Sequence, residues 1–130
     1  MKNDYPSIDN ENAPEYAEKI NLLFKKNNVN WNALSLSPTK QVLVQPRDSY
    51  CSLPNVARIR VHVKEGVMYL DINAYPRIKN SDSRYALEDK GYNYYERDNS
   101  TSLCLFIKPL ENLEAITEEV KEIEPILLQK

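Results

Sequence analysis

Hydrophobic and polar residues alternate most strictly over residues 56–75, on both sides of Glu65 and Gly66. Before this pair, apolar residues alternate with cationic ones. After it, they alternate with tyrosine, aspartate and asparagine. A period of two is typical of strands that bury one face. The pattern therefore predicts two antiparallel strands joined by a tight turn at Glu65 and Gly66.

The register of this hairpin follows if Glu65 and Gly66 are its two central turn residues. The predicted apolar face has three cross-strand pairs: Val63 with Met68, Val61 with Leu70, and Ile59 with Ile72. The predicted polar face has three more: His62 with Tyr69, Arg60 with Asp71, and Arg58 with Asn73. A shift by one residue would mix the two faces, so the pattern specifies one register.

Two segments show the period of an amphipathic helix. Residues 13–27 carry an apolar stripe and follow Asn12, a residue type that caps helices. From residue 113 onwards a second apolar stripe recurs every three or four positions: Leu113, Ile116, Val120, Ile123 and Leu127. Glutamates fill the side expected to face solvent: Glu111, Glu114, Glu118, Glu119 and Glu122. Pro125 is expected to kink or end this helix near Glu124.

Shorter elements are expected between these helices. Residues 41–45, 92–96 and 103–107 are rich in β-branched, aromatic or other apolar residues and predict strands, the first stopped by Pro46 and the last by Pro109. A short helix is expected near residues 83–90, ended by Gly91. Residues 29–40 predict a loop or short turn that sends three side chains to the core: Trp31, Leu34 and Leu36. Residues 1–11 predict a flexible arm.

The order helix, about five strands, helix predicts an α+β fold with an antiparallel sheet. We expect a single domain over residues 1–130, with the N-terminal and C-terminal helices packed on one face of the sheet. The other face then stays largely open. Cationic and polar side chains occupy it: Arg58, Arg60, His62, Lys64, Tyr69, Asp71, Asn73 and Tyr75.

Composition excludes several function classes. The 130 residues are 42% hydrophobic and 28% charged with a net charge of −2, so the chain should fold and has no global attraction for polyanions. Two glycines cannot form a phosphate-binding loop, and one histidine cannot form a zinc site with two histidines. We expect no cofactor and no metal ion.

Localisation is inferred from what the chain lacks. The two cysteines, Cys51 and Cys104, have no CxxC spacing. No signal peptide or apolar run long enough for a membrane span is present, so we expect a cytoplasmic protein with reduced thiols and no membrane partner. The high asparagine content is typical of an AT-rich bacterial or phage genome.

Three function hypotheses remain, and we favour the first. It is a non-enzymatic module that binds a protein partner or a second copy of itself. The second is a nucleic-acid-binding domain that uses a basic face and the nearby Arg77 and Lys79. The third is a magnesium-dependent nuclease, suggested by Asp71 followed by Glu88-Asp89-Lys90. The candidate binding residues are Arg58, Arg60, His62, Lys64, Tyr69, Asp71, Arg77, Tyr92 and Tyr94.

The last 75 residues or so also resemble small uncharacterised bacterial α+β domains. The likeness rests on the pattern over residues 57–74, the stretch Tyr75-Pro76-Arg77-Ile78-Lys79, and Leu110-Glu111-Asn112-Leu113 before a terminal helix. Such domains occur alone or appended to predicted nucleases and transport proteins. Residues 77–91 depart from the pattern because they lack a glycine-rich turn. The resemblance implies the α+β fold, and the family has no assigned activity.

Overall fold

The structure, a computed structural model, describes residues 5–35, 41–48, 51–53, 56–74, 82–96 and 104–128. It has the expected α+β class, with six strands rather than five. The elements follow in the order α1 (Ala13–Lys26), β1 (Trp31–Ser35), β2 (Val42–Pro46), β3 (Ala57–Lys64), β4 (Val67–Ala74), α3 (Asp82–Asp89), β5 (Asn93–Glu96), β6 (Cys104–Leu110) and α4 (Ala115–Leu127).

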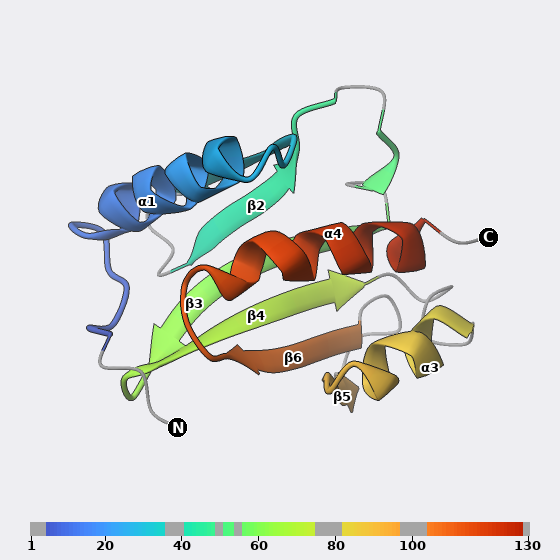
Figure 1. Cartoon of the computed structure of the whole chain (residues 1–130). Helices are drawn as coiled ribbons and strands as arrows, with labels where there is room; N and C mark the ends of the chain where they lie inside the picture. The colour runs from blue at the N-terminus through green and yellow to red at the C-terminus, as the bar shows by residue number, and fades with distance from the viewer. Residues whose placement is uncertain are drawn as a thin grey trace.

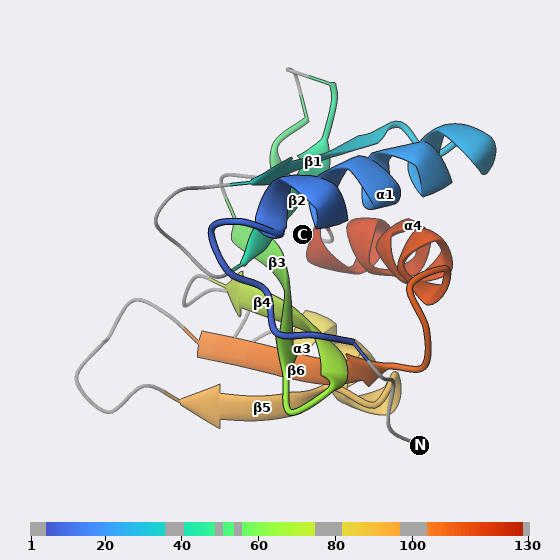
Figure 2. The same cartoon turned by 90° about the vertical axis from the view of Figure 1, so that its left-hand side faces the viewer.

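The six strands form one sheet in the order β1-β2-β3-β4-β6-β5, and all neighbours run antiparallel. Strands β1 and β5 are therefore the edges. Helices α1 and α4 lie side by side on one face of the sheet, as predicted, and α3 lies on that face beside the end of α4 (Figures 1 and 2). None of the described helices lies on the opposite face.

The β3–β4 hairpin has the predicted register. Val63 faces Met68 and His62 faces Tyr69, and the pairing continues as expected to Ala57 and Ala74. Both turn residues have positive φ angles, 54° at Glu65 and 75° at Gly66. A two-residue turn of type I′ needs positive φ at both central positions, so the local backbone fixes the register that the side chains require.

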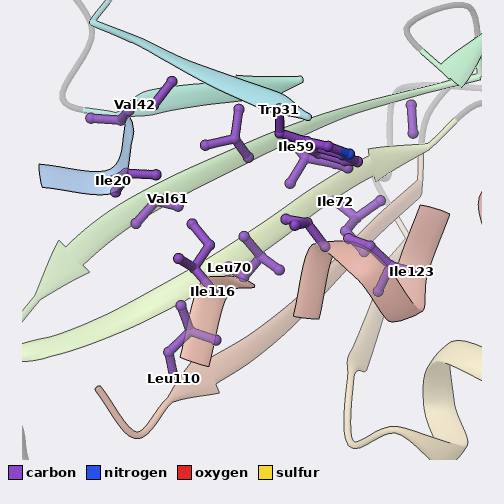
Figure 3. Close-up of a cluster of buried hydrophobic side chains, with 14 of the residues drawn as sticks. Ile20, Trp31, Val42, Ile59, Val61, Leu70, Ile72, Leu110, Ile116 and Ile123 are labelled. Atoms are coloured by element: carbon purple, nitrogen blue, oxygen red, sulfur yellow. The ribbon is translucent and has the colours of Figure 1, made fainter. Parts of the chain in front are cut away.

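The core fills the space between the sheet and helices α1 and α4. Strands β3 and β4 contribute Ile59, Val61, Leu70 and Ile72, all with 0% exposure. Ile20 of α1 and Ile116 and Ile123 of α4 pack from the helix side (Figure 3). The stripes of both helices are buried as predicted, except that Leu113 precedes α4 and is half-buried.

Strand β1 differs from the loop expected near residue 31. Trp31 and Ala33 are buried on the helix side, whereas Leu34 points the other way and is 37% exposed. The segment pairs with β2 from Trp31 opposite Pro46 to Ser35 opposite Val42. The prediction of a loop is wrong here because only two of the five residues are buried, too short an alternation to indicate a strand. Leu36 lies outside the described residues.

Two prolines do not end their elements as expected. Helix α4 continues through Pro125 to Leu127, which is 1% exposed, and Leu128 donates its N–H to the Glu124 carbonyl. Burial of Leu127 offsets the hydrogen bond lost at the proline. Strand β6 continues through Pro109 to Leu110. Strand β5 begins opposite Ile107 and does not extend to Pro109. No β5 carbonyl therefore faces Pro109, so the missing N–H of this proline costs no hydrogen bond to β5.

Residues 5–11 differ from the flexible arm expected there. Ile8 is 1% exposed in the core. The Tyr5 hydroxyl accepts the N–H of Leu113 at 3.0 Å, and the Tyr16 hydroxyl donates to the Pro6 carbonyl at 3.1 Å. Asn12 stands at the start of α1, but its side chain does not cap the helix. It accepts the Asp9 N–H and so closes the turn before the helix.

We predict that Leu70→Ala lowers the free energy of unfolding by about 2–4 kcal/mol, because it truncates a fully buried side chain at the centre of the sheet. The matched control is Leu22→Ala, the same change at a side chain that is 60% exposed, which should change stability by less than about 0.5 kcal/mol. Urea unfolding measures both. Equal effects of the two substitutions would contradict the packing.

Candidate functional site on the open sheet face

The face of the sheet opposite the helices is called the open face below. It includes the following residues of β2, β3, β4 and β6, whose side chains point away from the helices: Leu43, Arg58, Arg60, His62, Lys64, Tyr69, Asp71, Asn73, Leu105 and Ile107. Six of the nine predicted binding residues lie together here, on β3 and β4. Their grouping is a direct consequence of the hairpin register.

Asp71 is the centre of a polar network on this face. It is only 5% exposed. One of its carboxylate oxygens, Oδ2, lies 3.0 Å from His62 Nδ1 and 3.5 Å from Gln41 Nε2. Arg60 Nη1 donates to Gln41 Oε1 at 3.1 Å. Although Arg60 faces Asp71 in the register, the arginine therefore reaches the carboxylate through Gln41, and His62 makes the direct contact from a diagonal position.

His62 is held between two partners. Its ring stacks on Tyr69, with centroids 5.3 Å apart and planes inclined by 21°. Nδ1 faces Asp71 in an ionic contact when the imidazole is protonated. The alternation in the sequence predicts only that His62 lies on the polar face of the hairpin. The structure instead makes His62 the link between an aromatic ring and a buried carboxylate.

The network retains unused hydrogen-bonding capacity. Arg60 Nε, His62 Nδ1 and Asp71 Oδ1 are buried, and none of them makes a hydrogen bond within the described part of the chain, so His62 Nδ1 meets Asp71 as a close ionic contact rather than as an aligned hydrogen bond. Buried polar atoms are normally paired, and leaving one unpaired costs free energy. Arg60 and Asp71 are facing residues of β3 and β4, so the unpaired donor and the unpaired acceptor belong to one cross-strand pair.

The four basic residues of β3 are not equivalent. Arg58 and Lys64 are exposed, whereas Arg60 and His62 are half-buried and engaged in the network. Arg58 and Lys64 are six residues apart, about 20 Å along a strand. The open face therefore presents two separated exposed cations on β3, with a partly neutralised centre between them. Half-buried apolar side chains lie beside this centre: Leu43, Leu105 and Ile107.

Tyr92 does not belong to this surface. It is 3% exposed on the helix side, and its hydroxyl donates to Glu119 Oε2 at 2.7 Å. Burial raises the pKa of the Tyr92 hydroxyl far above its usual value, and the negative charge of Glu119 adds to this effect. Lys108 donates to the other oxygen of Glu119 at 2.8 Å. Tyr92 therefore joins β5 to α4.

The same contacts correct the expectation that Glu119 faces solvent. Glu119 is 8% exposed and sits between α4 and the sheet. Lys90 lies 3.8 Å from it and also pairs with Glu122, whose pKa is lowered by that hydrogen bond. The helical period alone cannot separate a buried, neutralised glutamate from a solvated one. The partners that permit its burial come from distant parts of the chain.

Tyr94 also lies on the helix side. Its ring packs on Phe106 with centroids 5.1 Å apart, and the Arg84 guanidinium lies 4.1 Å from its centroid. The neighbouring Tyr95 points to the open face and is 52% exposed. Alternation along β5 predicts this split, so Tyr95 could have been chosen from the sequence in place of Tyr94. Arg77, Lys79 and Tyr75 lie outside the described residues.

The spacing that suggested a nuclease does not form a site in the structure. Asp71 points to the open face, whereas α3, which carries Glu88 and Asp89, lies on the helix side (Figure 2). Glu88 pairs with Arg84 at 2.8 Å and Lys90 with Glu122. Within the described ranges no cluster of three or more histidine, cysteine, aspartate or glutamate residues could hold a metal ion.

Comparisons with known proteins show a fold relationship. No family model and no curated protein matches the chain. Among solved structures it is similar to YbjN from E. coli, described as a proposed transcription regulator, with 8% sequence identity and a TM-score of 0.52. The likeness covers 87% of this chain and 89% of that one. At this identity the likeness shows the fold alone.

The helices described here are short. Helix α1 has 14 residues and α4 has 13, and none in the described segments is long and apolar enough to cross a membrane.

We predict that Asp71→Asn lowers the free energy of unfolding by about 1–3 kcal/mol, because it removes the buried charge that faces His62. The control is Asp89→Asn, the same change at an exposed position, which should alter stability by less than about 0.5 kcal/mol. Denaturant unfolding at pH 6 compares them. If both variants match the wild type, the network does not stabilise the open face.

A second prediction concerns the junction between β5 and α4. Tyr92→Phe leaves one oxygen of the buried Glu119 without its donor and should cost about 1.5–3 kcal/mol of stability. Tyr95→Phe, which alters an exposed tyrosine three residues further along the chain on the open face, should be near neutral. Thermal unfolding of the pair distinguishes them, and a neutral Tyr92→Phe variant would show that this hydrogen bond is dispensable.

Proposed function

We propose that this protein is a protein-interaction module and that its partner docks on the open face of the sheet. The observation that carries the proposal is the arrangement of charge on that face. The central polar side chains, Asp71, Arg60 and His62, contact one another or Gln41. The exposed cations of β3 stand at its two ends, with apolar side chains beside the centre.

This arrangement matches the usual anatomy of a protein interface. Such interfaces have a core depleted in charge and enriched in tyrosine and other apolar groups, surrounded by a polar rim. Tyr69, Leu105 and Ile107 would contribute to the core of the contact, and Tyr95 extends it towards β5. Arg58 and Lys64 would lie at the rim, where they favour a partner carrying acidic groups about 20 Å apart.

A partner of different sequence fits better than a second copy. The exposed glutamates of α4 could meet Arg58 and Lys64 of another molecule, but that contact would join unlike surfaces. Repeated unlike contacts generate rings or open filaments unless the rotation closes. A distinct acidic and apolar partner satisfies the same charges without this consequence.

Nucleic-acid binding is the second candidate, and it rests on the cations of β3. The proposed regulatory role attached to YbjN also makes nucleic acid a reasonable target to test. Phosphate binding gains affinity from each neutralised phosphate. Arg60 and His62 are engaged with Gln41 and Asp71, the buried carboxylate lies between the two exposed cations, and the chain carries a net charge of −2. These features favour a protein partner.

The test uses the double variant Arg58→Glu with Lys64→Glu, which reverses only the exposed cations. The matched control is Lys26→Glu with Lys121→Glu, the same charge change at exposed positions of α1 and α4. A partner is first isolated with the wild-type protein, then purified and titrated against each variant by calorimetry. We expect the open-face variant to bind at least about tenfold more weakly and the control to bind like the wild type.

The same three proteins are also titrated with labelled DNA and RNA at low and high salt. Salt-sensitive binding that the open-face variant abolishes would replace the proposal with the nucleic-acid alternative. Unchanged partner affinity in the open-face variant would place the interface elsewhere. A wild-type protein that forms a dimer, broken only by the open-face variant, would identify a second copy as the occupant.

A further inference from the structure

The outer edge of β1 borders a wide groove on the described surface. A groove of about 750 Å³ runs between α1 and this strand. Its apolar lining comes from Ala17, Leu22, Val29, Trp31, Ala33 and Leu34. Leu22 is 60% exposed and Leu34 is 37% exposed, two of the four large hydrophobic residues that the described chain leaves exposed.

The hydrogen bonds of β1 show which main-chain groups face this groove. Arg47 donates its N–H to the Asn30 carbonyl, so residue 30 bonds towards β2. Alternate residues of an edge strand point their N–H and C=O groups to opposite sides. Trp31, Ala33 and Ser35 therefore direct theirs away from β2, towards the edge of the sheet.

Asn21 of α1 occupies the middle of this edge. Its Oδ1 accepts the N–H of Ala33 at 2.7 Å, and its Nδ2 donates to the carbonyl of Ala33 at 3.0 Å. This is the pair of bonds that one residue of a neighbouring antiparallel strand would make. A side-chain amide thus stands in for a strand and satisfies an edge that could otherwise attract another chain.

The role of Asn21 in protecting the edge of β1 does not explain why a groove lies beside it. A guarding residue needs neither a hollow of this volume nor an exposed leucine beside it. We propose that the outer edge of β1 is a docking surface for an extended segment of another polypeptide, which pairs with β1 in place of Asn21. The volume suits about five residues, within the range of ordinary ligand pockets. This surface is separate from the open face and does not depend on the function proposed for it.

The charges at the two ends of the groove define the segment further. The chain reverses direction between α1 and β1, at Asn28, whose φ is 57°. The last turn of α1, with Lys25, therefore lies near the start of β1, where Arg47 Nε donates to the Trp31 carbonyl at 3.1 Å. Glu18 lies one helical turn to the other side of Asn21. A fitting segment is acidic at the Trp31 end, apolar in the middle and basic at the Ser35 end.

Displacement of Asn21 is energetically feasible. The incoming strand makes the same two hydrogen bonds to the Ala33 main chain that Asn21 makes, so the number of hydrogen bonds changes little. Covering Leu22 adds apolar burial that the empty groove lacks. The Asn21 side chain remains at the surface of a helix, where water can satisfy its amide. Asn21 is thus a competitor of the segment, and its removal should strengthen binding.

The test uses a capped peptide of sequence lysine-valine-leucine-valine-glutamate, titrated into the ¹⁵N-labelled full chain and followed by the amide resonances. In an antiparallel pairing its glutamate lies near Lys25 and its lysine near Glu18. We expect saturable shifts at Trp31 to Ser35. Asn21→Ala should bind about three- to tenfold more tightly. Leu22→Glu should bind at least about fivefold more weakly, because it loses apolar contact.

Two controls separate this site from nonspecific effects. Tyr85→Glu places the same new charge at another exposed apolar position, 65% exposed on α3, and should leave affinity unchanged. Lys25→Glu should lower the affinity for the peptide by about two- to fivefold, and a peptide that ends in lysine instead of glutamate should recover the lost affinity. The Arg58→Glu, Lys64→Glu variant should bind the peptide normally, which separates this surface from the open face.

Three results would overturn the proposal. One is the absence of saturable shifts along β1 at millimolar peptide, in the wild type and in Asn21→Ala alike. Another is an Asn21→Ala variant that binds more weakly than the wild type. The third is an Asn21→Ala variant that dimerises on sedimentation and does not bind the peptide, since the occupant of the edge would then be a second copy of this chain.

Discussion

The pairing of β3 with β4 decides which side of the sheet can bind another molecule. Eight residue pairs alternate between an apolar face and a polar face, and the turn at Glu65 and Gly66 allows only one register. Helices α1 and α4 must bury their apolar stripes, so both pack on the apolar face. The polar face is left without a helix. The placement of Arg58, Lys64 and Asp71 on one accessible surface follows from this single constraint.

Much of the fold could be predicted because strict periodicity reports burial directly. The hairpin register and the two long helices depend on local alternation that one sequence displays. Strand β1 was missed because five residues with only two buried positions resemble a loop. Pro125 and Pro109 were misjudged because each lies near the end of its element, where tertiary burial or the end of a neighbouring strand removes the usual penalty.

The sequence predicts which residues share the open face, but it predicts only some of the contacts between them. Register placed six candidates on one face, but it paired Arg60 with Asp71, whereas the carboxylate contacts His62 and Gln41. Gln41 directly precedes β2, so no local pattern could reveal its role. Tyr92 was expected at a binding surface and Glu119 on the solvent side of its helix. Both expectations are wrong because the two side chains bond to each other across 27 residues of sequence, which no local pattern shows. The role of Asn21 could not be predicted, because an asparagine in a helical pattern gives no indication that it bonds to the main chain of a strand.

The central claim is that the molecule has one helix-covered face and one accessible face. Methyl relaxation induced by a soluble gadolinium complex tests it most directly, because neighbouring residues of β6 and β4 supply probes of both sides. The account predicts strong relaxation of the methyl groups of Leu105 and Ile107 and almost none at Ile72 and Leu70. Equal protection of all four side chains in the isolated protein would contradict it.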